Sequence, residues 1–124
     1  MSQRSPIWSP TTSATHWLFA DGVQVAAAWL ATAPSERRTG LLGTDGLEGA
    51  LWIERCSSVH TFGMRYTLEV AFVSRAGKVL STTRMERSRL GRPRLRARAV
   101  LEVPTGKLRD WHITPGVVLS LVGS

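Results

Sequence analysis

Hydrophobic and polar residues alternate over several short stretches of this chain, and such alternation is typical of β-strands. The clearest stretch is YTLEVAF at residues 66–72, in which apolar side chains occupy every second position. Shorter or less regular versions of the pattern predict further strands at residues 17–20, 23–30, 50–55, 79–83, 99–103 and 117–122.

Turn-forming residues separate these strands. Asp21-Gly22 provides the left-handed backbone that a tight hairpin needs, and Arg75–Lys78 and Pro115-Gly116 also predict turns. A helix start is predicted at Pro34–Glu36, because the Ser35 hydroxyl can cap free N–H groups. Together these elements predict a mainly β fold, a small antiparallel β-sandwich or partly closed barrel of seven to eight short strands with one short helix.

A chain of 124 residues has the length of one domain. Residues 1–15 are rich in Ser, Thr and Pro and show little periodicity, so we expect a flexible N-terminal arm and a single domain at residues 16–124. Residues 23–36 resemble the end of a signal peptide, but the strand pattern on both sides of the Asp21-Gly22 turn favours a hairpin there.

Three bulk features describe the expected setting of the protein. No stretch reaches the roughly 20 apolar residues of a transmembrane helix, so we expect no membrane span. The single cysteine, Cys56, excludes an internal disulfide and is typical of a cytoplasmic protein. The edge strands of so small a fold are compatible with a monomer or a homodimer.

The formal net charge of +7 suggests a nucleic-acid partner at first sight. However, 14 of the 16 basic residues are Arg, a skew that a GC-rich genome produces in all its proteins. The most basic segment, residues 84–98, contains no aromatic side chain on which a base could stack. Nucleic-acid binding through segment 84–98 is therefore an alternative that the sequence does not favour.

Four short motifs follow one another along the chain: RRTGLL at 37–42, VHTFGMR at 59–65, LEVAF at 68–72 and VLEVP at 100–104. In these motifs and their order the chain resembles the DUF192 (UPF0127) family, small bacterial and archaeal proteins with no established biochemical activity. The resemblance extends from about Phe19 to the C-terminus. It implies a mostly β, sandwich-like domain.

The chain departs from the family pattern at several characteristic positions. Thr67 replaces the usual Pro, Glu69 replaces the usual Asp, and Thr105 replaces the usual Ala. Near the C-terminus, Gly116 is followed by Val117, where relatives often have an Asp. If the family uses that last carboxylate in a site, this chain lacks it.

The HTFGMR motif contains the polar groups best suited to chemistry. The His60 imidazole can act as a general base if Glu69 or Cys56 serves as its partner, which describes a hydrolase-like enzyme. No oxyanion-hole motif accompanies these residues, so the enzyme is an alternative interpretation. We expect neither a metal site nor a cofactor, because His and Cys residues are few and the glycine-rich stretch 40–49 has no nucleotide-binding pattern.

Two arginines favour a binding role instead. Arg37 and Arg65 can each hold a carboxylate or phosphate in a forked geometry, although an ion pair with Glu69 or Glu54 is the competing structural interpretation. The leading hypothesis is a non-enzymatic binding or accessory module that recognises a small anionic ligand or a protein partner at the His60–Arg65 bend. Its candidate ligand-binding residues are Arg37, His60, Thr61, Met64, Arg65 and Glu69.

Overall fold

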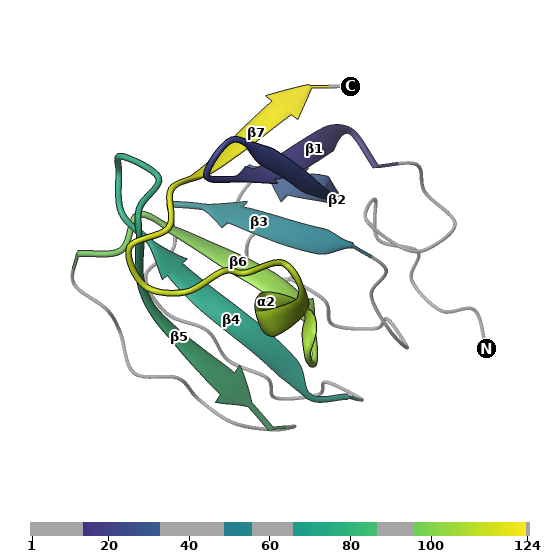
Figure 1. Cartoon of the computed structure of the whole chain (residues 1–124), viewed down its shortest axis with the longest axis vertical. Coiled ribbons are helices and arrows are strands. Elements are labelled where there is room, and N and C mark those ends of the chain that lie inside the picture. Colours follow the sequence, from purple (N-terminus) through teal and green to yellow (C-terminus); the bar gives the residue numbers. More distant parts are fainter. Residues whose placement is uncertain (1–13, 33–48, 56–65, 87–95, 124) are drawn as a thin grey trace.

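The computed structural model describes residues 14–32, 49–55, 66–86 and 96–123. These residues form one seven-stranded sheet of order β5-β4-β6-β3-β2-β1-β7 and one short helix, α2 (Figure 1). The elements are β1 (His16–Ala20), β2 (Val23–Ala31), β3 (Ala50–Glu54), β4 (Leu68–Val73), β5 (Val79–Met85), β6 (Ala99–Pro104), α2 (Lys107–Asp110) and β7 (Leu119–Gly123). The prediction of a mainly β fold with seven strands is confirmed.

Neighbouring strands of the sheet are antiparallel except for β2 and β3, which run parallel. The sheet is therefore mixed, a detail that the prediction of antiparallel pairing did not include. The predicted Asp21-Gly22 hairpin between β1 and β2 is confirmed, with φ angles of 47° and 82° at these two residues. Both values lie in the left-handed region that such a turn requires.

The two edges of the sheet meet at one end. The start of β5 approaches the segment before β7, where Lys78 and Val118 form an isolated antiparallel bridge. The N–H of Val79 donates to the carbonyl of Val117 at 2.8 Å, and the N–H of Leu119 donates to the carbonyl of Gly77 at 2.7 Å. The sheet thus curls into a partly closed barrel, and Figure 1 shows the segment before β7 passing the β4–β5 turn.

Hydrophobic side chains cover both faces of the sheet. One cluster is centred on residues of β3, β4 and β6 that share a face: Leu51, Ile53, Leu68, Val70, Phe72 and Val100. The cluster on the opposite face includes Ala71, Val73, Leu101 and Val103, together with Leu108 from α2 and Ile113 after it. Because α2 packs on this second face, the central strands β4 and β6 are buried on both sides (Figure 1).

The helix prediction and the observed helix concern different parts of the chain. The helix start predicted at Pro34–Glu36 lies outside the described residues. The described helix, α2, was not predicted, because a single turn is too short to show a helical period. No described helix has the length and apolar character that crossing a membrane requires.

Candidate functional site

Most of the residues that the sequence proposed for a site lie outside the described part of the chain. Residues 87–95 of the arginine-rich segment do so as well. The candidates outside the described part are Arg37, Cys56, His60, Thr61, Met64 and Arg65. The site at the His60–Arg65 bend, the enzymatic alternative and the nucleic-acid alternative therefore remain predictions.

Glu69 is the sequence-predicted site residue that the structure does describe. It is half-buried on β4, on the sheet face that α2 covers. Its Oε1 atom accepts a hydrogen bond of 3.2 Å from the backbone N–H of Leu108. Gly106, at the N-cap of α2, has no side chain that could accept such a bond, so Glu69 satisfies one of the free N–H groups of the helix from a distant strand. One role of Glu69 is thus to fix α2 to the sheet.

Glu69 also lines a pocket of about 560 Å³ between strands β4 and β5 and the segment Leu108–Thr114, which we call the Glu69 pocket. The residue directly opposite Glu69 on β5 is Arg84. The Nε atom of Arg84 lies 3.5 Å from the Oε1 atom of Glu86. Among the described residues, no ion pair involves Glu69. The other polar residues of this pocket are Thr82, Thr83, Arg84, Arg109, His112 and Thr114.

A second pocket, of about 400 Å³, lies at one end of the sheet and is lined by arginines from three different elements. Arg55 follows β3, Arg75 is in the turn between β4 and β5, and Arg98 precedes β6. We call this the arginine pocket. None of the three was proposed as a site residue from the sequence.

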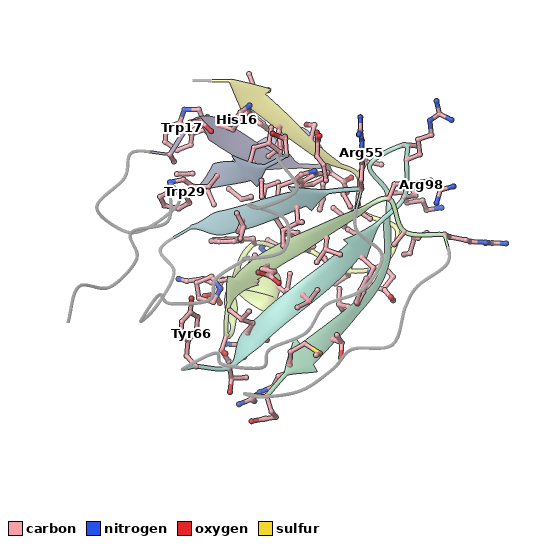
Figure 2. The ribbon with its side chains drawn as sticks, turned by 180° about the vertical axis from the view of Figure 1, so that it is seen from behind. His16, Trp17, Trp29, Arg55, Tyr66 and Arg98 are labelled. Carbon is pink, nitrogen blue, oxygen red and sulfur yellow. The ribbon has the colours of Figure 1, made fainter. Side chains whose placement is uncertain are left out.

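The register of the central strands explains why these arginines meet. Ala99, the first residue of β6, pairs with Glu54 on one side and with Val73 on the other. The residues just beyond this row, Arg55 and Arg98, therefore protrude from the same end of the sheet (Figure 2). The N–H of Arg98 donates to the carbonyl of Val73 at 2.8 Å, which ties the start of β6 to the end of β4 next to the Arg75 turn.

The arginine pocket has a basic rim and an apolar floor. All three arginines are exposed, whereas Trp52 and Leu121 are half-buried and belong to the hydrophobic cluster beneath. The backbone of Arg55 has a φ of 54°, which is uncommon for a residue other than glycine. Because guanidinium groups keep their charge at any physiological pH, this rim favours negatively charged groups.

A third polar feature lies in the core. Glu102, in the middle of β6, is 5% exposed and lies between Leu51 and Val70 on the face opposite α2. Its Oε1 atom has no hydrogen-bond partner among the described residues. Burial raises the pKa of Glu102 from 4.5 to about 7, because the charged form loses the solvation that water provides.

The sequence contained an indication that Glu102 is buried, but the alternating pattern of its strand concealed it. AVLEV reads as an alternating strand with Glu on the solvent side, yet its other residues are almost all apolar, which is typical of a strand buried on both faces. The arginine pocket had no such local signal, because Arg55, Arg75 and Arg98 are far apart in the sequence. In the described part of the chain, no three His, Cys, Asp or Glu residues gather closely enough to hold a metal ion.

Comparison with known proteins identifies a matching family and solved structures of similar fold. The model of the family DUF192, described as "Uncharacterized ACR, COG1430", matches residues 17–121. No curated protein matches the chain significantly.

Two similar solved structures illustrate the likeness in fold. A protein from Sinorhizobium meliloti 1021, provisionally described as a transcription regulator, superposes with a TM-score of 0.74 at 17% identity, over 89% of this chain and 96% of the other. A protein of unknown function from Novosphingobium aromaticivorans DSM 12444 gives a TM-score of 0.69 at 18% identity, over 94% and 93% of the two chains. At these identities the likeness shows a shared fold.

Proposed function

This chain belongs to the DUF192 family, whose description assigns no activity, and we propose that it is a non-enzymatic binding module for a small anionic ligand. The observation that supports this proposal is the convergence of Arg55, Arg75 and Arg98 on one pocket. The ligand would carry a carboxylate or phosphate group, the two anions that the guanidinium fork fits in a bidentate way.

The size and lining of the arginine pocket suit a small molecule. Its volume of about 400 Å³ is within the usual range of ligand sites. The described lining residues include three arginines but only one carboxylate, that of Glu54. A bound anion would therefore reduce the electrostatic repulsion between the positively charged arginines. The half-buried faces of Trp52 and Leu121 would contact the uncharged part of the ligand.

The lining of the pocket favours binding over catalysis. Among its described lining residues are two hydroxyls, from Ser74 and Ser120, but no His or Cys that could act as general base or nucleophile. The enzyme alternative depends on His60 and Cys56, which lie outside the described residues. Its other predicted participant, Glu69, has one carboxylate oxygen engaged with the Leu108 N–H.

The His60–Arg65 bend follows Arg55 closely in the sequence and remains a separate prediction. The two proposals can be distinguished by measuring ligand affinity in Arg65→Ala and Arg98→Gln variants. If only Arg98→Gln weakens binding, the arginine pocket alone holds the anion. If only Arg65→Ala does so, the ligand belongs to the bend.

A thermal-shift screen against phosphate, sulfate, citrate and benzoate tests the proposed function. We expect at least one anion to raise the melting temperature of the wild type, and both Arg75→Gln and Arg98→Gln to reduce that rise. Arg96→Gln is the matched control, because Arg96 is exposed, lies two residues from Arg98 and is not among the lining residues. An equal loss in the Arg96→Gln variant, or no rise with any anion, would contradict the proposal.

A further inference from the structure

We propose that the Glu69 pocket is a second binding site, independent of the proposed anion site, and that its ligand is a small zwitterion of the amino-acid type. Such a ligand carries an ammonium group and a carboxylate group on one compact molecule. The described lining residues of the Glu69 pocket and the arginine pocket do not overlap, so occupancy of one does not require the other.

Glu69 provides the acceptor for the ammonium group. Its Oε1 is already held by the Leu108 N–H at 3.2 Å, which fixes the side chain in one position before any ligand arrives. The guanidinium directly across the strand pair, that of Arg84, lies beside Glu86 with an Nε to Oε1 distance of 3.5 Å. The Glu69 carboxylate is thus not paired with this guanidinium, and it has lone pairs left for further donors.

The opposite wall provides donors for the carboxylate group. Arg109 is 89% exposed at its side chain, and its Nε is 3.9 Å from Asp110 Oδ1, which is too long for a hydrogen bond. The guanidinium of Arg109 therefore has N–H groups available for an anion. His112, next along this wall, adds an imidazole.

The backbone holds His112 in place despite a φ of 56°. The His112 N–H donates to the Arg109 carbonyl at 3.1 Å, and the next N–H, that of Ile113, donates to the Leu108 carbonyl at 2.8 Å. Ile113 is 2% exposed and anchors the segment in the core. The exposed imidazole is consequently attached to a hydrogen-bonded and anchored part of the backbone.

The mixture of charges selects a zwitterion over a simple ion. A lone anion entering this pocket meets the Glu69 carboxylate, and a lone cation meets Arg84 and Arg109. A molecule with both charges places each of them opposite a group of the opposite charge. The hydroxyls of Thr82, which shares this sheet face, and of Thr114 can bond to other polar atoms of the ligand. The arginine pocket differs here, because its charge is mainly of one sign.

Titration calorimetry with a panel of free L-amino acids tests this inference. We expect at least one to bind, and its N-acetyl derivative, which lacks the ammonium, to bind at least about tenfold more weakly. Its amide derivative, which lacks the carboxylate, should be weakened as well. If no amino acid binds, or if the N-acetyl form binds equally well, the inference is wrong.

Glu69→Gln locates the effect, because the amide oxygen can still accept the Leu108 N–H bond while the charge is removed. We expect Glu69→Gln to lose at least about tenfold in affinity with an unchanged melting temperature. Glu54→Gln is the matched control, because Glu54 is also a half-buried strand glutamate but does not line the Glu69 pocket, and this variant should bind normally. Equal affinity in wild type and Glu69→Gln would overturn the inference. Arg98→Gln should bind the amino acid normally. The proposal for the Glu69 pocket can therefore be wrong while the proposal for the arginine pocket holds, and the reverse.

Discussion

Glu102 shows how one residue changes the energetics of an otherwise apolar core. Its carboxyl group lies between Leu51 and Val70 in the middle of the sheet, and it is almost fully buried. Ionising a carboxyl group there costs free energy because no water solvates the charge. Near neutral pH the group therefore exchanges between protonated and charged forms, unlike an exposed glutamate.

This exchange predicts a specific pH dependence of stability. The pKa of Glu102 is 4.5 when unfolded and about 7 when folded, so the folded state binds more protons between these values. The free energy of unfolding should therefore fall as pH rises from 4.5 to about 7, and remain low above that range. The fall should be up to about 3 kcal/mol, and urea unfolding at about pH 5 and about pH 8 would measure it.

Glu102→Gln is the control, since the amide has nearly the same shape but does not titrate in this range. We expect its free energy of unfolding to differ less between the two pH values than that of the wild type. Glu54→Gln, at the end of β3 with a half-buried side chain, should leave the pH dependence intact. If Glu102→Gln and the wild type show the same pH dependence, Glu102 does not titrate as described.

Helix α2 is an element that depends on the sheet for its existence. A helix of four residues cannot form alone, because the free-energy cost of nucleating a helix exceeds the stabilisation that the hydrogen bonds of one turn provide. Two contacts stabilise it here: the buried side chain of Leu108 and the Glu69 carboxylate on the Leu108 N–H. Both walls of the Glu69 pocket are consequently linked to the docking of α2.

Leu108→Ala should therefore destabilise the protein by about 2–4 kcal/mol, the usual range for truncating a buried leucine. The change should also increase hydrogen exchange at the Asp110 and Ile113 N–H groups, which are bonded within this segment. Arg109→Ala, on the exposed side of the same turn, serves as control and should change the free energy of unfolding by less than about 0.5 kcal/mol. Normal protection of these N–H groups in Leu108→Ala would show that α2 does not rely on Leu108.

At the scale of single elements, the strands could be predicted because alternation and turn residues are local features of the sequence. Residues 66–72 showed the period of a strand, and β4 was found at Leu68–Val73. The parallel pairing of β2 with β3 was not predictable, because it joins segments separated by a long stretch of sequence. The same holds for the arginine pocket, whose members are gathered only by the register of β3, β4 and β6.

At the scale of the whole molecule, the meeting of the two sheet edges brings β7 to the arginine pocket. Gly77 is central to this closure, because its carbonyl accepts the Leu119 N–H at 2.7 Å. A Cβ at position 77 would lie 2.5 Å from the Leu119 carbonyl oxygen, which is closer than real contacts allow. The residues around this contact, Gly77 and Leu119, both line the arginine pocket.

Gly77→Ala and Gly106→Ala form a matched pair that isolates the closure. Both glycines have a φ of 89°, but nothing lies within 4 Å of a Cβ at Gly106. Both variants should lose about 1–2 kcal/mol because of the left-handed backbone, and Gly77→Ala should lose about 1–3 kcal/mol more because of the clash. Urea unfolding measures the difference, and equal losses would mean that the edges are not held together at Gly77.

The central claim, that the arginine pocket binds a small anion, is tested most directly by NMR of the arginine side chains. Titration with the anion that gives the largest thermal shift should move the Nε–Hε signals of Arg55, Arg75 and Arg98. The signals of Arg84, Arg96 and Arg109, which do not line this pocket, should stay in place. Uniform shifts of all arginines, or shifts confined to those outside the pocket, would contradict the account.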